Sequence, residues 1–295
     1  MFNLVDSIAN LYSSAAIKYS IPEQTAVTRW TLMMPGAGCE YWKKTNGGCT
    51  MCGFNNLTKK YTRGLLFPSF IFKLLYRLGR KALTTKAPNE VSVFNGGNFW
   101  NEKEIPSGFQ SFLLKEVAKD RDLTRLMIES RCDYVTEARV SNALEILNGK
   151  KLKIAIGLES QDDFVRNQLI RKGMSKRIFE NKVGMARKCG AEVLVYVFLK
   201  PVGLDEGKAL KEALATIRYA LLTGATEIEL SCAFIQEGTR MANAYHRGEF
   251  KPPYLWTILE IINEVIKNDW PVSIGGFNDE PPPIAIPSNC SDCSP

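Results

Sequence analysis

The chain has 295 residues, of which 45% are hydrophobic and 23% are charged, a globular composition with ample length for a core. The best candidate for a membrane span, residues 65–75, is interrupted by Pro68 and Lys73, and no stretch reaches the roughly 18 consecutive apolar residues that a span requires. The N-terminus lacks the basic and apolar regions of a signal peptide. We therefore expect a cytoplasmic protein with no membrane partner, whose eight cysteines are reduced thiols or metal ligands.

The net charge of +7 is unevenly distributed along the chain. Residues 57–88 contain eight basic residues and no acidic one, with aromatic residues between them. The basic residues of this segment are Lys59, Lys60, Arg63, Lys73, Arg77, Arg80, Lys81 and Lys86. Such a segment is typical of a surface that attracts a phosphate backbone, and it is equally compatible with a solvated helix face.

In chain order, the pattern begins with a short helical cap over residues 1–25 and then alternates apolar strands with amphipathic helices. The predicted strands are residues 26–34, 91–94, 123–129, 153–158, 193–199 and 227–230, with a short last strand at 271–274. The predicted helices are residues 67–83, 107–119, 136–147, 162–170, 175–189, 206–222 and 255–266.

Strands that recur every 30–40 residues, each followed by a helix, predict repeated βα units and a parallel sheet. We expect an α/β fold of the partial (β/α)6 TIM-type barrel class. The expected domains are the cap at 1–25, the barrel at 26–235, and a C-terminal extension at 236–295 with a Pro-rich tail. Polar motifs follow several strands, at the strand ends where such folds collect their chemistry.

Three cysteines, Cys39, Cys49 and Cys52, form a C-x9-C-x2-C pattern directly after the first predicted strand. Glycines flank the second pair, and tight glycine turns let several thiolates converge on one inorganic centre. A structural zinc ion would need a fourth ligand, and the only histidine of the chain is the distant His246. Three thiolates suit a [4Fe–4S] cluster with one open iron; a zinc knuckle or buried thiols are the alternatives.

The sequence resembles the radical S-adenosylmethionine (radical SAM) enzymes over residues 26–235. The first cysteine spacing is six residues longer than the usual C-x3-C-x2-C of that family, as in the branch that resembles the Elongator catalytic subunit. Segments 129–135 (ESRCDYV), 156–175 (IGLESQDDFVRNQLIRKGMS) and 198–201 (FLKP) are similar to that branch. Segments 47–54 (GGCTMCGF), 95–106 (NGGNFWNEKEIP) and 238–256 (GTRMANAYHRGEFKPPYLW) resemble the radical SAM subunits of archaeosine synthases.

The resemblance implies that Cys39, Cys49 and Cys52 ligate a [4Fe–4S] cluster whose fourth iron binds SAM. Further cofactor contacts are implied in three places. Met51 or Phe54 would meet the adenine, and the 95–98 loop (Asn95, Gly96, Gly97, Asn98) would receive the SAM amine, with Asn98 in place of the acid of the family. Glu129, Arg131, Glu159 and Ser160, together with Lys172, are the candidates for the ribose hydroxyls and the methionine carboxylate.

The implied reaction is reductive cleavage of SAM to a 5′-deoxyadenosyl radical that abstracts hydrogen from substrate. The implied substrate is a lysine-adducted 7-deazaguanine in tRNA, which a lyase-type C–N cleavage would convert to archaeosine. A reductase or ferredoxin-type electron donor and a lysine-transferring enzyme would be its partners. Two alternatives remain: a radical SAM enzyme acting on a small metabolite or peptide, and a non-catalytic Fe–S or zinc protein that binds RNA.

Several polar or thiol groups lie outside this scheme. A buried Glu129 or Glu159 requires a partner, either SAM or a structural Arg or Lys. Cys290 and Cys293 could hold a second metal site only with added ligands, and the alternative is a simple tail.

Overall fold

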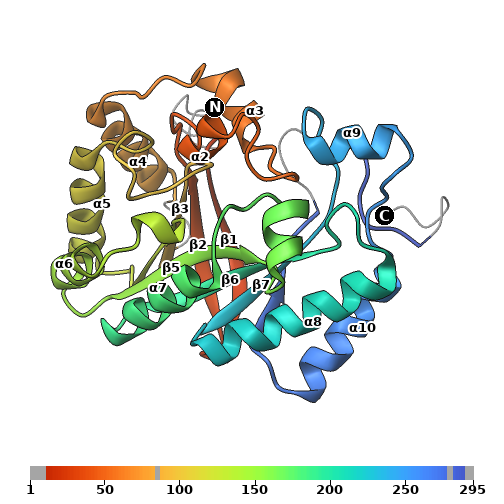
Figure 1. The fold of residues 1–295 in the computed structure, drawn as a ribbon. Helices are drawn as coiled ribbons and strands as arrows, with labels where there is room; N and C mark the ends of the chain where they lie inside the picture. Colours follow the sequence, from red (N-terminus) through yellow and green to blue (C-terminus); the bar gives the residue numbers. More distant parts are fainter. Residues whose placement is uncertain (1–10, 84–86, 278–281, 290–295) are drawn as a thin grey trace. The chain divides into compact units, whose positions relative to one another are not determined.

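The computed structural model describes residues 11–83, 87–277 and 282–289 (Figure 1). Its strands are hydrogen-bonded in sequence order from β1 to β8. The pair β1–β2 is antiparallel, whereas the pairs from β2 to β5 and from β6 to β8 are parallel. The strands are β1 (Ser13–Ser20), β2 (Thr25–Met33), β3 (Glu90–Phe94), β4 (Arg125–Glu129), β5 (Lys151–Glu159), β6 (Glu192–Leu199), β7 (Glu227–Cys232) and β8 (Val272–Ile274).

The helices follow the strands, as repeated βα units require. They are α2 (Glu40–Lys44), α3 (Phe54–Tyr61), α4 (Ser69–Ala82), α5 (Ser107–Lys119), α6 (Glu137–Leu147), α7 (Lys176–Lys188), α8 (Glu206–Thr223), α9 (Arg240–His246) and α10 (Leu255–Lys267). In the part of the chain that the structure describes, none of them has both the length and the apolar character needed to span a membrane.

The predicted order of parallel strands and helices is confirmed. The structure adds the short helices α2, α3 and α9, and two expected elements differ locally. The helix expected at 162–170 contains a π-helical turn over Val165–Leu169. The helical cap expected over residues 1–25 is wrong for residues 13–20, which form the edge strand β1. This strand carries exposed Ile17 and Tyr19 and few β-branched residues, so its sequence resembles neither a buried strand nor an alternating one. Its conformation is imposed by pairing with β2.

The chain divides into two compact units, and the first consists of the described parts of Met1–Glu40, Thr58–Ala155 and Met185–Val193. Helices α4, α5 and α6 lie side by side along one flank of this unit (Figure 1). Phe72 of α4 packs on Phe109 of α5, with ring centroids 5.3 Å apart. These buried rings close the apolar side of the helices against the sheet.

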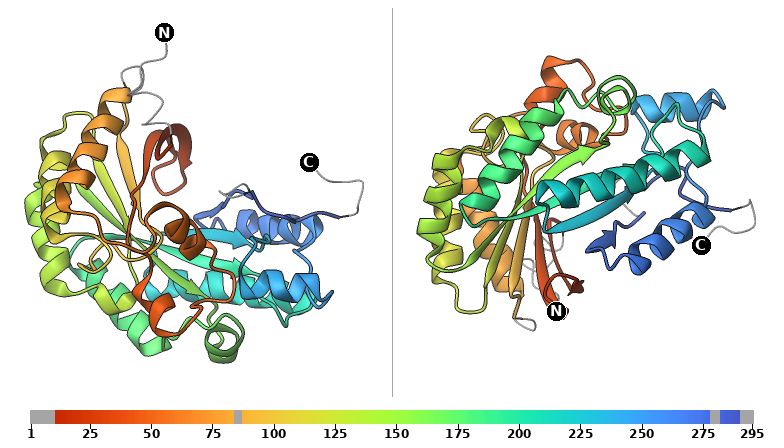
Figure 2. Two further views of the ribbon diagram at one scale, coloured as in Figure 1. Left: turned by 90° about the horizontal axis from the view of Figure 1, so that it is seen from above. Right: turned by 60° about the horizontal axis from the view of Figure 1, so that its bottom comes forward.

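The second unit consists of the described parts of Tyr41–Leu57, Ile156–Gly184 and Leu194–Pro295. Helices α8 and α10 run beside each other in this unit, and α8 also contacts β7 (Figure 2). A separate apolar cluster joins Ile170, Phe198, Ile235 and Met241. This cluster joins the ends of β6 and β7 to α9. Met51, which lies between Cys49 and Cys52, packs against it.

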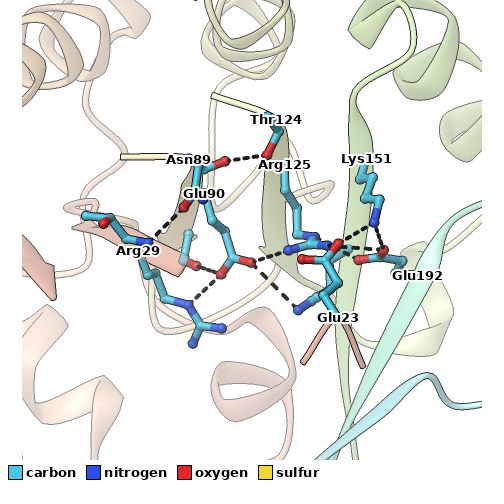
Figure 3. Close-up of polar contacts among 11 residues, drawn as sticks. Glu23, Arg29, Asn89, Glu90, Thr124, Arg125, Lys151 and Glu192 are labelled. Carbon is cyan, nitrogen blue, oxygen red and sulfur yellow. Dashed lines mark hydrogen bonds and ion pairs between the residues drawn. The ribbon is translucent and has the colours of Figure 1, made fainter. Parts of the chain in front are cut away.

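Charged residues form one row across the first unit, near the N-terminal ends of its strands (Figure 3). Arg29, Glu90, Arg125 and Lys151 occupy paired register positions on β2, β3, β4 and β5. Side chains at one register position of a parallel sheet point to the same face, so these four groups meet. Arg125 pairs with Glu90 at 3.2 Å, while Arg29 pairs with Glu90 at 2.5 Å.

Two more carboxylates complete this ion-pair network. Glu192 at the start of β6 contacts Arg125 at 2.8 Å and Lys151 at 3.4 Å. Glu23, in the turn between β1 and β2, contacts the same two bases. The turn therefore reaches across the strand starts and pins the β1–β2 hairpin to β4 and β5 (Figure 3).

Burial and charge oppose each other in this network. Burial raises the pKa of Glu90, but the positive charges of Arg29, Lys153 and Arg125 outweigh it and lower the pKa overall. Hydrogen bonds from Arg125 and Lys151 lower the pKa of Glu23 to about 2. Both carboxyl groups are therefore ionised at neutral pH, and each depends on the Arg125 guanidinium.

We expect Arg125→Met to lower the free energy of unfolding by about 3 kcal/mol, because it removes one of the three cations around the buried Glu90 and the shared partner of Glu23 and Glu192. Urea unfolding at neutral pH measures the change. Arg247→Met, which removes an exposed pair with Glu249, is the matched control and should change the stability little. Equal effects of the two substitutions would contradict a central role for Arg125.

The lowered pKa of Glu23 predicts how the stability of the fold depends on pH. Its folded-state pKa of about 2 lies below its ordinary value of 4.5, so its contribution to stability is present above pH 4.5 and is lost as the pH falls toward 2. Glu23→Gln should therefore be less stable than the wild-type chain at neutral pH, with a difference that shrinks over that window. Urea unfolding over a pH series tests this, with the exposed Glu145→Gln as control. A difference that does not change with pH would contradict the assignment.

Candidate cofactor site

The motifs predicted to bind cofactors directly follow the C-terminal ends of strands. In the first unit, Cys39 lies in the loop after β2, the 95–98 loop follows β3, and Arg131 follows β4. In the second unit, Ser160 follows β5 and Lys200 follows β6. This is the position from which βα loops supply the chemistry of parallel folds.

Glu104 holds the chain on both sides of Cys39 within the first unit. The Ala37 N–H donates to the Glu104 backbone carbonyl at 3.3 Å, and the Glu40 N–H donates to its Oε1 at 2.9 Å. Cys39 itself is half-buried between these two anchors. The position of the first cysteine therefore depends on a residue 65 positions later in the chain.

The same carboxylate also organises the loop after β3. Glu104 is fully buried, and it accepts hydrogen bonds from Nδ2 of Asn98 and Nδ2 of Asn101, each at 2.8 Å. The Asn98 backbone N–H donates to its other oxygen, Oε2. With the Glu40 N–H, four donors surround one buried carboxylate, which removes the cost of burying it.

Gly97 and Asn98 are adapted to this arrangement. A Cβ atom at Gly97 would lie 1.9 Å from Oε2 of Glu104 and 3.4 Å from the Cα of Cys39, so only glycine fits there. Oδ1 of Asn98 accepts a hydrogen bond from the Arg131 N–H at 2.8 Å. Asn98 therefore links the loops after β3 and β4, and its side chain and backbone N–H both donate to the Glu104 carboxylate, six residues later.

Asn95 is the one side chain of this loop with an unused donor. It is 4% exposed, and its Nδ2 has no hydrogen-bond partner within the described residues. A buried amide donor without a partner costs free energy, and a ligand with an oxygen acceptor would recover it. Gly96 precedes Gly97 with φ of +65°, a left-handed conformation that suits glycine.

Glu40 forms a second polar group beside Glu104. Its Oε2 accepts hydrogen bonds from the Tyr134 hydroxyl at 2.8 Å and from Nδ2 of Asn101 at 2.9 Å, and its Oε1 pairs with Lys103 at 3.0 Å. Burial, together with the neighbouring Glu40 carboxylate, raises the pKa of Tyr134, so this phenol stays protonated and donates. Neither Glu40 nor Glu104 stands out in the sequence, because neither belongs to a recognisable motif.

Glu129 and Arg131 lie at the end of β4, as expected. The Glu129 carbonyl accepts a hydrogen bond from the Phe99 N–H at 2.9 Å, and its side chain is half-buried. The Arg131 guanidinium pairs with the exposed Asp133 at 3.2 Å. Both residues thus belong to the same unit as Cys39 and the 95–98 loop.

In the second unit, Cys49 and Cys52 bound a tight turn. The Cys52 N–H donates to the Cys49 carbonyl at 3.1 Å, and both thiols are half-buried. Thr50, between them, donates through its N–H to the Ile170 carbonyl at 2.9 Å and through its hydroxyl to the Leu169 carbonyl at 2.6 Å. These bonds fix the C-x2-C turn against the segment that follows β5.

Glycine is sterically required on both sides of this turn. A Cβ atom at Gly48, whose φ is +56°, would lie 2.8 Å from the Trp42 ring. At Gly53 it would lie 1.9 Å from Oε1 of Gln236. Glycine on both sides therefore allows the Trp42 and Gln236 side chains to pack closely against the turn that carries the two cysteines.

Met51 and Phe54, the predicted adenine contacts, have different settings. Met51 packs against the apolar cluster of the second unit, and Phe54 begins α3 with a half-buried ring. The next residue, Asn55, is 4% exposed, and its Nδ2 has no partner among the described residues. Sequence reasoning missed Asn55. Its side-chain amide is a buried donor in the second unit, as that of Asn95 is in the first.

Glu159 and Lys172 form an ion pair in the second unit, with Nζ of Lys172 2.7 Å from Oε1 of Glu159. Glu159 ends β5 with φ of +69°, a strained conformation for a residue other than glycine. A Cβ at Gly157 would lie 2.3 Å from both charged atoms, so the pair lies directly over that glycine. The basic partner that a buried Glu159 was expected to need is thus Lys172.

Ser160 forms hydrogen bonds with residues of its own unit. Its hydroxyl donates to Oε1 of Glu212 on α8 at 2.6 Å, and it accepts from the Asp162 N–H at 3.1 Å. It is 1% exposed. These contacts tie the loop after β5 to α8, and they give Ser160 a structural task at this position.

The donor set fits an iron–sulfur cluster with SAM. The three half-buried thiols Cys39, Cys49 and Cys52 follow strand ends or lie in a glycine turn, and two buried amide donors, Asn95 and Asn55, lack partners within the described residues. Cys39 belongs to the first unit, and the other two cysteines belong to the second. Among residues 11–83, 87–277 and 282–289, no three His, Cys, Asp or Glu side chains already form a metal-binding group. Cys290 and Cys293 lie outside these residues.

The remaining cysteines and the histidine have other surroundings. Cys132 and Cys232 are buried, and burial raises the pKa of the Cys232 thiol to about 12, which keeps it protonated. His246 is exposed and contacts Glu237 at 2.9 Å. Cys232 therefore packs as a core residue in this structure.

Comparison with known proteins identifies the family. The chain is 32% identical over 275 residues to archaeosine synthase subunit beta of Methanosarcina acetivorans, covering 90% of this chain and 74% of that protein. The chain belongs to the family of archaeosine synthase beta subunits. The beta subunit of Thermococcus kodakarensis is 27% identical over 233 residues, which are 78% of this chain and 70% of that protein. No protein-family model matches the chain.

Solved structures agree on the fold. A queuine lyase from Clostridium spiroforme, bound to SAM and queuine, aligns with a TM-score of 0.56 at 13% identity, over 90% of this chain and 95% of that one. An N-terminally truncated Elp3 of Methanocaldococcus infernus aligns with a TM-score of 0.54 at 18% identity, over 75% and 57%. The predicted fold class and the resemblance to radical SAM enzymes are thereby confirmed, and the chain is a radical SAM protein.

Glu104→Gln tests the anchoring of the cysteine loop. A glutamine keeps the shape but replaces one acceptor oxygen by a donor, so the N–H groups of Glu40 and Asn98 lose part of their partner. We expect hydrogen exchange to accelerate in the peptides around residues 40 and 98. Glu102→Gln, exposed and two residues away, should leave both unchanged. Unchanged exchange in Glu104→Gln would contradict the anchoring role.

Proposed function

We propose that this chain is the radical SAM subunit of an archaeosine synthase, converting a lysine-adducted 7-deazaguanine in tRNA to archaeosine by cleavage of a C–N bond. The observation that carries the proposal is the 32% identity to an archaeosine synthase subunit beta over 90% of the chain. The fold neighbour that is a queuine lyase bound to SAM and queuine supports a lyase reaction on such a base.

In this proposal Cys39, Cys49 and Cys52 hold a [4Fe–4S] cluster with SAM on its open iron. Together these groups supply a 5′-deoxyadenosyl radical that removes hydrogen from the lysyl portion of the substrate. A reductase or a ferredoxin-type protein provides the electron. A lysine-transferring enzyme attaches the lysine beforehand, and the word subunit in the names of the relatives supports a partner of this kind.

The protein's own residues hold and shield the reactants. Glu104 fixes the backbone beside Cys39 and the 95–98 loop, whose Asn95 amide offers a donor to an oxygen of the cofactor. Asn55 offers a second donor beside Phe54. Glu129 and Glu159 are carboxylates suited to ribose hydroxyls, and Lys172 positions the Glu159 side chain through their ion pair. Rigid positioning of this kind determines which C–H bond the radical reaches.

The test is anaerobic. The chain is reconstituted with iron and sulfide, reduced, and given SAM and lysine-adducted tRNA; 5′-deoxyadenosine is measured by chromatography and archaeosine by nucleoside mass spectrometry. We expect both products, and the loss of both in Cys49→Ala. The matched control is Cys232→Ala, a buried thiol outside the proposed ligand set, which should retain both products after correction for folded protein.

Measuring both 5′-deoxyadenosine and archaeosine distinguishes a wrong substrate from a wrong reaction class. Production of 5′-deoxyadenosine without archaeosine would contradict the proposed substrate and favour a small metabolite or peptide. Failure of the reduced, iron-loaded chain to bind SAM or to form 5′-deoxyadenosine with substrate would contradict the radical SAM reaction itself, and would favour a non-catalytic protein that binds RNA.

A further inference from the structure

A long stretch of the chain has no negative charge. No Asp or Glu occurs from Tyr41 to Asn89, although the chain contains 31 acidic residues elsewhere. The part of this stretch that belongs to the first unit includes the end of α3, the 62–68 connection and α4. Its exposed basic residues are Lys59, Lys60, Arg63, Arg77 and Lys81.

Helix α4 separates a packed face from an exposed face. Phe72, Tyr76 and Gly79 are buried against the core of the first unit. Phe70, Leu74, Arg77 and Lys81 are exposed, at spacings of four, three and four residues, which places them along one side of a helix. This exposed stripe is apolar toward the N-terminal end of α4 and basic toward its C-terminal end.

Several exposed bases of the chain are held in ion pairs. Elsewhere, Lys103 pairs with Glu40, Lys267 with Glu264 and Arg247 with Glu249. Within α4, Arg80 pairs with Asp120 and Asp122.

By contrast, Lys60, Arg63, Arg77 and Lys81 form no ion pair with any residue that the structure describes. Their charges face solvent uncompensated, and such a field attracts a polyanion.

Aromatic rings are exposed among these charges. Tyr61 is 63% exposed and Phe70 is 65% exposed. Nζ of Lys60 lies 5.2 Å from the Tyr61 ring centroid, and the Arg77 guanidinium lies 5.3 Å from that of Phe112. Exposed rings beside cations are the elements that stack on unpaired bases while the cations contact phosphates.

We propose that the surface formed by Lys60, Tyr61, Arg63, Phe70, Arg77 and Lys81 binds the substrate tRNA, with its cations on the phosphate backbone and its rings on unpaired bases. The proposal rests on the proposed function and names the surface by which the chain holds its substrate. An acidic protein could match the charge, but it would not use the exposed rings of Tyr61 and Phe70, of which Tyr61 lies beside the Lys60 cation. RNA supplies the phosphates and the base faces together.

The test is a binding titration of the full, reconstituted chain with a fluorescently labelled, unmodified tRNA transcript over a series of salt concentrations. Arg77→Gln/Lys81→Gln removes two charges from the basic end of the stripe. We expect it to weaken binding and to reduce the slope of log affinity against log salt by roughly 2. Phe70→Ala should weaken binding roughly tenfold without changing the slope.

The matched control is Lys211→Gln/Lys251→Gln, which removes the same charge from exposed sites of the second unit. It should keep the wild-type affinity and slope. All variants are compared by urea unfolding, so that a folding defect is recognised. Production of 5′-deoxyadenosine is measured in parallel, because it reports on the proposed function without reporting on this surface.

Three results would overturn the proposal. The first is a wild-type slope in Arg77→Gln/Lys81→Gln. The second is equal loss in the control pair, which would indicate attraction by net charge alone. The third is a surface variant with wild-type tRNA affinity that no longer forms archaeosine when the lysine-transferring partner is present. That result would indicate that the surface binds a partner protein.

If the wild-type chain itself forms no 5′-deoxyadenosine, the result counts against the proposed function and not against this surface.

Discussion

The ion-pair network around Arg125 is the constraint on which the first unit depends. Four successive strands, β3 to β6, begin with a charged residue: Glu90, Arg125, Lys151 and Glu192. The guanidinium of Arg125 joins three carboxylates at 4% exposure, so strand register, hairpin position and charge balance are set together. A one-residue slip of β4 would bury several unpaired charges, which makes the alternative registers costly.

The opposite ends of the same strands carry the loops of the proposed cofactor site. There the buried Glu104 carboxylate holds the loops in place, as Arg125 holds the strand starts. It accepts hydrogen bonds from the segment around Cys39 and from the 95–98 loop. The two ends of the strands thus have different roles. The N-terminal ends fix the strand register, and the C-terminal ends carry the backbone and thiol groups of the proposed site.

The sequence was informative where apolar runs and motif spacing decide the outcome. Buried strands such as β4 and β6 are almost continuous apolar runs, and the βα alternation around them predicts the parallel fold. The cysteine spacing and the glycine turns similarly led to the correct family. These signals are local in sequence, so one chain suffices to find them.

What sequence analysis could not predict depends on contacts between distant residues. β1 is a strand only because β2 pairs with it, and Glu104 acquires its role only through Glu40, 64 positions earlier in the chain. Lys172 is a predicted cofactor contact, and its ion pair with Glu159, 13 residues earlier, could not be read from the sequence. No periodicity or motif encodes such pairings, because they result from how the backbone folds.

The contacts of Glu104 also bear on how the protein matures. The hydrogen bonds that the structure gives this carboxylate all come from the chain itself and hold the backbone beside Cys39. In the proposed function, these bonds would hold the loop both before and after Cys39 binds a cluster. Loss of Glu104 would then disturb the loop in the metal-free chain as well as in the loaded one.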